Sequence, residues 1–173
     1  MTYHRSGKKP RLTEFRSSPR RIVNLRLAWL CSEGPPGLAK LTRGRDCKSA
    51  VKKGLSYERR ALRYIRSLDL PGQFYEKQWI AFRDENGRGW AQPDGFIVMA
   101  DLVLVLEMKL TQTFTAVDQI KFLYKPLLEK IYSLPVLGLQ VCKGLRHMDQ
   151  YMVLHPSELL LSRSPMIHTM HVI

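Results

Sequence analysis

The hydrophobic positions between Ser49 and Leu68 recur at the spacing of an α-helix. They are Val51, Leu55, Leu62, Ile65 and Leu68. Most lysines and arginines of this segment fall at the other positions, so the pattern predicts an amphipathic helix with one apolar and one basic face. Pro71-Gly72 follows and is expected to end this helical region.

Short apolar runs replace the helical pattern in the middle of the chain. Phe74–Phe82 is rich in aromatic and apolar residues and predicts a strand, and Asn86-Gly87 predicts a reversal into a hairpin partner. Two further strands are expected at Asp94–Met99 and Leu102–Leu110. The second is apolar on both faces, which is typical of a strand covered on both sides in an α/β sandwich.

A helix and another strand are expected next. Thr115 and Asp118 fit a capping box for a helix over Ala116–Ile131, which Pro126 should kink or split. Val136–Val141 is a further apolar strand. Because a strand, a helix and a strand joined in this order usually lie parallel through a right-handed crossover, we expect a parallel pair here.

The C-terminal part completes an α/β architecture. His155–Glu158 has the composition of a helix start, and Met166–Ile173 is expected to form a terminal strand. A chain of 173 residues with 45% hydrophobic residues is sufficient for one domain of ordinary size. The sequence therefore predicts a mixed β-sheet flanked by helices over residues 49–173.

Basic charge is concentrated near the N-terminus. The chain has 28 Lys and Arg against 15 Asp and Glu, and residues 1–48 contain 12 and 3 of these, which leaves a net charge of +9 in that segment. The segment is rich in Ser, Pro, Gly and Arg around one apolar cluster, Ile22–Leu30, and predicts a basic N-terminal arm or partly ordered extension. Such a charge favours a polyanionic partner, nucleic acid first and an anionic membrane second.

The cysteines and the apolar runs favour an intracellular soluble protein. The three cysteines form no C-x-x-C pair and are odd in number, as expected of free thiols in a reducing compartment. Gly95–Leu110 is too short and too charged to cross a bilayer, and Arg26 interrupts the apolar run of a possible signal sequence. The cytoplasm, nucleoid or nucleus is expected, with organelle targeting by the basic N-terminus as the alternative.

Charged side chains break the apolar pattern at two places. Glu58 shares the helical face that carries Leu55 and Leu62. Glu107 and Lys109 are two residues apart on a strand and therefore face the same side as the apolar residues before them. A buried carboxylate costs several kcal/mol unless it is paired or bound to a metal, so these positions are candidates for function, with a structural ion pair as the alternative.

Asp94 is a third anomaly, and its position depends on the hairpin register. If Ala100-Asp101 forms a two-residue turn, Met99 pairs with Leu102 and Asp94 lies directly opposite Glu107. The Cβ atoms of such a pair are about 4.5–5.5 Å apart, close enough for both carboxylates to bind one cation. The alternative is that Asp94 is only a turn residue.

Together, these residues predict a carboxylate cluster with one lysine. Oxygen ligands alone favour Mg²⁺ or Mn²⁺ over zinc. A hard metal among carboxylates on a basic protein indicates phosphodiester hydrolysis, because the metal polarises the phosphate and lowers the pKa of a bound water. Lys109 is then expected to orient or activate the attacking water, or to stabilise the developing charge.

The residues also resemble a known family. Pro93-Asp94, followed by Glu107-Met108-Lys109 on the next strand, resembles the motif of the PD-(D/E)XK nuclease superfamily, and Glu58 is similar to the acid that many members carry on the preceding helix. The resemblance covers roughly residues 49–145 and implies a restriction-endonuclease-like fold. It implies that Asp94 and Glu107 are metal ligands, Lys109 the catalytic lysine and Glu58 a further ligand, directly or through water.

Gln119 extends the resemblance to a subgroup of that superfamily. Phage-exonuclease-like members place a Gln after the E-x-K strand, four residues before a Tyr. Here the following tyrosine is Tyr124, which is five residues away and departs from that pattern. The alternative is that both residues belong to an ordinary helix surface and core edge.

The sequence thus predicts a Mg²⁺- or Mn²⁺-dependent deoxyribonuclease with a basic arm. The alternatives are a non-catalytic nucleic-acid-binding protein that retains a nuclease-like fold, and a membrane-surface protein that uses the arm. The choice between DNA and RNA, the mode of cutting and the oligomeric state are left open by the sequence.

Overall fold

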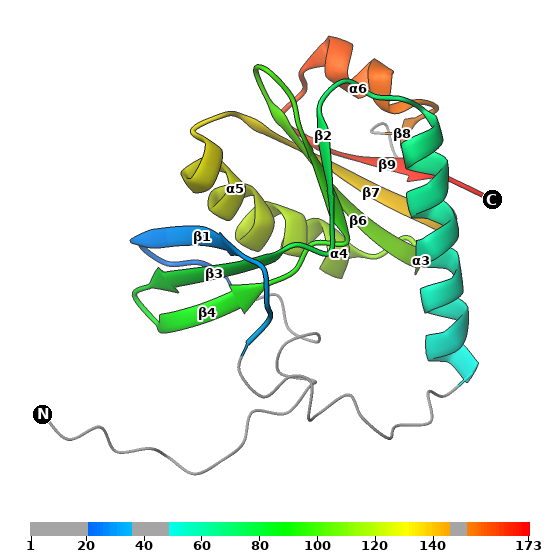
Figure 1. Ribbon diagram of the computed structural model, residues 1–173. Coiled ribbons are helices and arrows are strands. Elements are labelled where there is room, and N and C mark those ends of the chain that lie inside the picture. Colours follow the sequence, from blue (N-terminus) through cyan, green and yellow to red (C-terminus); the bar gives the residue numbers. More distant parts are fainter. Residues whose placement is uncertain (1–20, 36–48, 146–151) are drawn as a thin grey trace, which may run out of the picture.

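The computed structural model describes residues 21–35, 49–145 and 152–173, and these form a mixed α/β fold with two sheets (Figure 1). The larger sheet has six strands in the order β2 (Gln73–Glu76), β5 (Gly95–Val98), β6 (Val103–Thr111), β7 (Val136–Gly144), β9 (Ile167–His171) and β8 (Met152–Val153). The smaller sheet has the order β1 (Leu27–Cys31), β3 (Trp79–Asp84) and β4 (Gly87–Ala91). The expected mixed sheet flanked by helices is confirmed.

Helices cover both faces of the six-stranded sheet. They are α3 (Ser49–Ser67), α4 (Phe114–Gln119), the π-helical turn η1 (Ile120–Tyr124), α5 (Lys125–Tyr132) and α6 (Pro156–Ser162). Helices α3 and α6 pack on the face formed by Leu104 and Leu106 of β6, whereas η1, α5 and the smaller sheet cover the face formed by Val103 and Val105. Residues 103–108 are buried, which confirms that β6 is covered on both sides.

The hairpin between β5 and β6 has the register that the sequence predicts. Gly95 pairs with Leu106 and Val98 with Val103, in antiparallel order. The amide of Met99 donates to the carbonyl of Leu102 at 2.9 Å, as expected for the two-residue turn at Ala100-Asp101. The turn therefore fixes the register of both strands along their length.

The strand expected over Phe74–Phe82 is wrong, because two strands of different sheets occupy this segment. Strand β2 ends at Glu76 and pairs with β5, and β3 begins at Trp79 and pairs with β1 and β4. Lys77 between them has a φ of 50°, in the left-handed region, where a strand cannot continue. The amide of Lys77 donates to the carbonyl of Asp94 at 3.2 Å, so the break lies beside the candidate site.

The helix after β6 begins earlier than expected and is divided into three parts. The N-cap is Thr113, whose Oγ1 accepts from the amide of Ala116 at 3.3 Å, so the capping box expected at Thr115 and Asp118 is wrong. The expected split at Pro126 is confirmed, since η1 directly precedes α5, which carries this proline in its first turn. Proline lacks the amide that would bond to the carbonyl four residues earlier.

The carbonyl left free by Pro126 is used by the N-terminal part of the chain. The amide of Ile22 donates to the carbonyl of Phe122 at 3.1 Å, and the guanidinium of Arg21 lies 4.2 Å from the centre of the Phe122 ring. Strand β1 then adds to β3 in antiparallel order. Residues 1–20 and 36–48 of the predicted arm lie outside the described residues.

The C-terminal helix and terminal strand follow the predicted order, whereas β8 was not predicted from the sequence. Strands β6 and β7 are parallel, and β9 is parallel to β7. Helix α6 begins after His155, whose ring accepts from the amide of Ser157 at 3.2 Å. No helix in the described parts of the chain is long and apolar enough to cross a membrane.

Candidate active site

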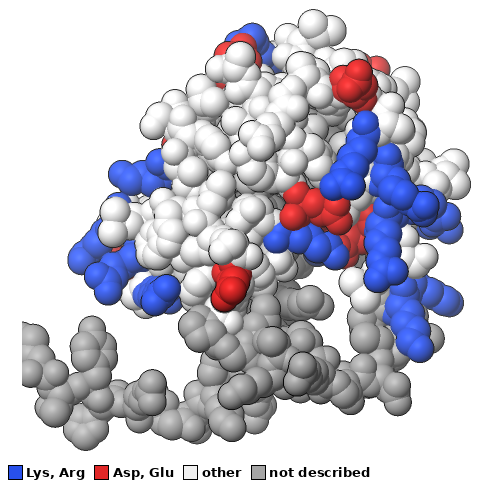
Figure 2. All heavy atoms as spheres, in the orientation of Figure 1, with Lys and Arg blue, Asp and Glu red and all other residues white. Residues whose placement is uncertain are grey.

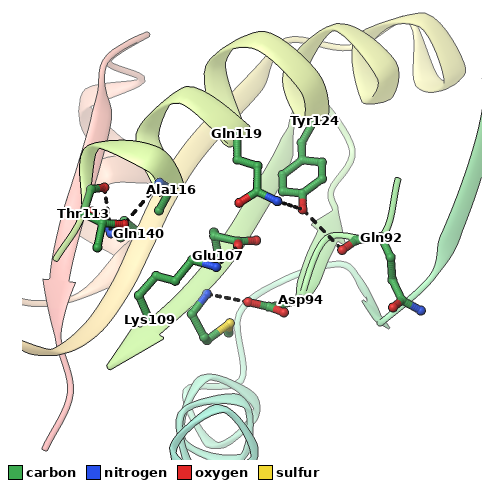
Figure 3. Close-up of polar contacts among 10 residues, drawn as sticks. Gln92, Asp94, Glu107, Lys109, Thr113, Ala116, Gln119, Tyr124 and Gln140 are labelled. Atoms are coloured by element: carbon green, nitrogen blue, oxygen red, sulfur yellow. Dashed lines mark hydrogen bonds and ion pairs between the residues drawn. The ribbon is translucent and has the colours of Figure 1, made fainter. Parts of the chain in front are cut away.

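The β5–β6 hairpin places Asp94 and Glu107 side by side at its open end, opposite the turn (Figure 3). Gly95 pairs with Leu106, so Asp94 and Glu107 are the next pair outward. The Oδ2 atom of Asp94 accepts from the amide of Met108 at 2.7 Å. This bond to the following residue of β6 holds the Asp94 carboxylate beside Glu107.

Glu107 is a buried carboxylate with only one of its oxygens paired. Its Oε1 lies 2.6 Å from Nζ of Lys109, and its side chain is 3% exposed. Its Oε2 is buried and has no hydrogen-bond partner among the described residues. The Lys109 side chain is 34% exposed, so the residue that pairs with this buried carboxylate is itself partly open to solvent. The predicted proximity of Glu107 and Lys109 is confirmed. The unpaired oxygen of Glu107 is available to coordinate a metal ion or to accept a hydrogen bond from a ligand.

Glu58 contributes a third negative charge from α3. Its Oε1 forms an ion pair with Nζ of Lys77 at 2.7 Å, and the Glu58 side chain is 16% exposed. Glu58 raises the pKa of both Asp94 and Glu107, so the three carboxylates interact electrostatically. Lys77 is a site residue that the sequence analysis missed, since its role follows from the break between β2 and β3.

Burial and mutual repulsion raise the pKa values of the two paired carboxyls. Burial, followed by the charge of Glu58, raises the pKa of Asp94 to about 6, although the Met108 amide opposes the shift. Burial, followed by the charge of Asp94, raises the pKa of Glu107 to about 8, although Lys109 opposes it. Without a cation, the pair therefore retains protons at a pH where isolated carboxyls are ionised.

The same charges set the protonation states of Lys109 and Tyr124. Burial lowers the pKa of Lys109, but Glu107, Asp94 and Glu58 together raise it above its ordinary value. Burial, followed by the charges of Glu107 and Asp94, raises the pKa of the Tyr124 phenol well above its ordinary value. Lys109 is thus a cation and Tyr124 a neutral hydroxyl at physiological pH.

Gln119 and Tyr124 reach the site from the helices above β6. Nε2 of Gln119 donates to Oη of Tyr124 at 2.9 Å, and Oη of Tyr124 donates to the carbonyl of Gln92 at 3.3 Å. Figure 3 shows both side chains pointing from the helix towards Glu107. The five-residue spacing is accommodated by the π-helical turn over Ile120–Tyr124, since residues five apart align in a π-helix as residues four apart nearly do in an α-helix.

Gln140 is a second site residue that the sequence analysis missed. It pairs with Glu107 across the parallel strands β6 and β7, and it is fully buried. Its Nε2 donates to the carbonyl of Thr113 at 3.2 Å, while its Oε1 has no hydrogen-bond partner among the described residues. The sequence did contain a signal for this residue, because Gln140 is a polar residue in an otherwise apolar strand. Val136–Cys142 contains no other polar side chain except the thiol of Cys142.

The donor set fits a hard divalent cation. Oε2 of Glu107 is an unpaired buried carboxylate oxygen, and a cation beside it would relieve the repulsion that raises the two pKa values. No cluster of three or more His, Cys, Asp or Glu side chains in the described regions forms a ready metal cage. Mg²⁺ needs no such cage, because proteins usually bind it through one or two carboxylates, water and substrate phosphate.

Comparison with protein-family models, with curated proteins and with solved structures finds no match for this chain.

Proposed function

We propose that the protein is a metal-dependent nuclease that hydrolyses phosphodiester bonds in DNA, with a core of the restriction-endonuclease-like type. The observation that carries the proposal is the buried Glu107, which has one oxygen on Lys109 and the other unpaired, next to Asp94 in the hairpin register. This arrangement supports the resemblance of Pro93-Asp94 and Glu107-Met108-Lys109 to the PD-(D/E)XK motif.

Asp94 and Glu107 would hold Mg²⁺ or Mn²⁺ in this mechanism. When bound, the metal would offset negative charge on the phosphate and lower the pKa of a water molecule. The free Oε2 of Glu107 and the Asp94 oxygen that does not bind the Met108 amide are the donors available for it. Glu58 adds negative charge to the same site and is held by Lys77.

Lys109 is the group that meets the substrate. Its ammonium is anchored by Glu107 and its side chain is one-third exposed, which would allow contact with both a water molecule and a phosphate oxygen. A cation there orients the attacking water or stabilises the charge that develops on the phosphate. Gln119 and Tyr124 act as positioning residues, because the Tyr124 hydroxyl interacts with the Glu107 carboxyl and Gln119 donates to that hydroxyl.

Cleavage assays with two conservative variants test this function. Supercoiled, linear, branched and single-stranded DNA, and RNA, are incubated with the full chain in Mg²⁺, in Mn²⁺ and in EDTA. Glu107→Gln and Asp94→Asn should abolish cleavage and leave DNA binding unchanged or tighter, because each removes a negative charge. Asp101→Asn is the matched control, since Asp101 is in the turn at the opposite end of the same hairpin and is half exposed.

Two results would contradict the proposed metal mechanism or its site. Full cleavage in EDTA would exclude the metal mechanism, and cleavage by Glu107→Gln would show that the site lies elsewhere. DNA binding without cleavage in either metal would support the alternative of a non-catalytic nucleic-acid-binding protein. The ion pairs of Glu58 with Lys77 and of Glu107 with Lys109 are the observation that favours this alternative, because they balance the carboxylates without a metal.

A further inference from the structure

Four basic residues form a row along one side of α3. Lys52, Arg59, Arg63 and Arg66 are exposed and are separated by seven, four and three residues. These intervals place them on one side of a helix, where 14 residues span about 21 Å. Figure 2 shows lysine and arginine side chains gathered over α3, with acidic side chains along their inner border.

The row borders a hollow between α3 and β2. The hollow has a volume of about 420 Å³ and is lined by Arg59, Leu62, Arg63, Arg66 and Glu76. Arg66 is held in place, since its guanidinium lies 2.7 Å from Oε2 of Glu76 and 5.0 Å from the centre of the Phe74 ring. Arg59 and Arg63 have no acidic partner among the described residues, so their guanidinium groups remain available to a ligand.

The row also lies next to the candidate active site. Arg59 directly follows Glu58 on α3, and Lys77, which pairs with Glu58, directly follows Glu76 in the chain. Glu58 and Lys77 both act on the charge of Asp94. A polyanion bound along α3 would therefore pass the Glu58–Lys77 pair and reach Asp94 and Glu107.

We propose that Lys52, Arg59, Arg63 and Arg66, the α3 basic row, bind the phosphodiester backbone of the nucleic acid and guide it to Asp94 and Glu107. This inference rests on the proposed function and names the surface that its substrate occupies. Guanidinium groups bind phosphate oxygens through two parallel hydrogen bonds, which suits arginine to this contact. An anionic membrane fits less well, because Tyr64 is the only exposed large hydrophobic residue among the described side chains of α3.

The test compares two double variants of the full chain. Arg59→Gln/Arg63→Gln removes two charges from the row. Lys53→Gln/Arg60→Gln removes two charges from the opposite flank of the same helix, where both residues are exposed. Glutamine keeps much of the side-chain length and helix propensity, so folding should be preserved in both variants. Binding to duplex and to single-stranded DNA is measured in EDTA over a range of salt concentrations.

The slope of log affinity against log salt should become less steep in the row variant and stay unchanged in the flank variant. Each lost phosphate contact lowers the slope of log affinity against log salt by about 0.9 for duplex and about 0.7 for single-stranded DNA, so two contacts give about 1.8 or 1.4. The form of DNA, duplex or single-stranded, whose binding loses the larger fraction of its salt slope is the form that occupies the row. Equal slopes in the two variants, or binding of the row to anionic phospholipid vesicles but not to DNA, would overturn the inference.

The same variants separate this inference from the proposed function. If the row variant binds DNA weakly and the wild-type protein does not cleave in Mg²⁺ or Mn²⁺, the row binds nucleic acid and the nuclease function is wrong. If the wild-type and row-variant proteins bind DNA with equal affinity and cleave it at equal rates, the nuclease function stands and the proposed role of the row is wrong.

Discussion

Glu107 combines burial, negative charge and an unpaired oxygen in one side chain. Desolvation of Glu107, together with the negative charge of Asp94, outweighs the compensation from Lys109, so the pKa of Glu107 is raised. A carboxyl with a raised pKa is more stable in its protonated form in the folded protein than in the unfolded chain. The folded state therefore binds protons that the unfolded state has already released.

The metal-free protein should accordingly lose stability as the pH rises from about 4 to about 8. Over this range the unfolded carboxyls are ionised, whereas the folded Asp94 and Glu107 retain protons until about pH 6 and about pH 8. We expect a decline on the order of a few kcal/mol in the free energy of unfolding. Urea denaturation in EDTA at several pH values measures it.

Glu107→Gln isolates the contribution of this carboxyl. The variant should show a smaller decline between pH 5 and pH 8 than the wild type, because glutamine does not titrate. Mg²⁺ should also reduce the decline in the wild type, since a cation stabilises the ionised pair. A variant with the same pH dependence as the wild type would show that Glu107 is not the group that retains the proton.

Lys77 and Glu58 form a pair whose function can be separated from its structural role. The pair is partly exposed, and such ion pairs contribute about 0–1 kcal/mol to stability. Lys77→Gln should therefore change the melting temperature little, but it frees the Glu58 carboxylate and should tighten Mn²⁺ binding severalfold. Glu58→Gln should weaken Mn²⁺ binding and cleavage, also with little change in melting temperature.

The double variant Glu58→Gln/Lys77→Gln distinguishes a role in metal binding from an ordinary ion pair. If Lys77 acts by neutralising Glu58, Lys77→Gln has no effect on Mn²⁺ affinity once Glu58 is glutamine. Mn²⁺ affinity by titration calorimetry and stability by urea denaturation give the two halves of the comparison. A loss of several kcal/mol in stability with unchanged Mn²⁺ affinity would mean that the pair is only structural.

At the scale of secondary-structure elements, the local features were predictable and the long-range ones were not. The register that places Asp94 beside Glu107 followed from a two-residue turn, and the basic face of α3 followed from helical periodicity. The division of Phe74–Phe82 between two sheets depends on a left-handed Lys77 and on pairing with β1, far away in the chain. Neither leaves a periodic signal in the sequence.

The π-helical turn is another feature that spacing alone did not specify. One extra residue between Gln119 and Tyr124 would rotate the tyrosine by about 100° away from its partner in a regular α-helix. The π-helical turn absorbs this residue and restores the contact of 2.9 Å between the two side chains. A five-residue spacing across a π turn thus gives the alignment that a four-residue spacing gives in an α-helix.

Deleting Lys121 should convert the π turn into an α-helical turn. Lys121 is exposed, and its removal leaves Gln119 and the tyrosine four residues apart, which keeps them on one face. We expect the deletion variant to fold, with a melting temperature within a few degrees of the wild type, and to cleave at a rate within about tenfold of it. Thermal melts and cleavage assays give the two readouts.

An insertion at the same position is the matched control. An alanine inserted after Lys121 leaves Gln119 and the tyrosine six residues apart, a spacing that neither an α turn nor a π turn aligns. It should reduce cleavage more strongly than the deletion does. If the deletion abolishes cleavage while the insertion is tolerated, the π turn does not act by aligning these side chains.

At the scale of the whole molecule, part of the basic N-terminal segment belongs to the fold. Ile22, Leu25, Ala28 and Leu30 pack against the hydrophobic cluster under the smaller sheet. Strand β1 supplies one edge of that sheet, and the amide of Ile22 bonds to a carbonyl that Pro126 leaves free. Basic charge and folding are therefore separable only if the chain is cut before this packed segment.

Two truncations should consequently behave differently. Removing residues 1–20 deletes six Lys and Arg and one Glu, and it leaves in place the contacts of residues 21–35 with the other described residues. That variant should melt within a few degrees of the full chain. If four of its lost charges reach DNA phosphates, the slope of log affinity against log salt should fall by about 3–4. Removing residues 1–48 also takes away β1 and the partly buried apolar side chains of Ile22, Leu25, Ala28 and Leu30, which should cost several kcal/mol of stability.

Urea denaturation and salt-dependent DNA binding measure the two effects in parallel. Cleavage at saturating DNA and low salt should survive the shorter truncation, because residues 1–20 contain none of Glu58, Asp94, Glu107 or Lys109. The longer truncation should lose cleavage together with its folding transition, since the smaller sheet helps to bury the face of β6 that carries Glu107. A stable, active protein without residues 1–48 would mean that β1 is dispensable, and an unchanged salt slope without residues 1–20 would exclude the extreme N-terminus from DNA binding. In the second case, the α3 basic row would be left as the main source of phosphate contacts.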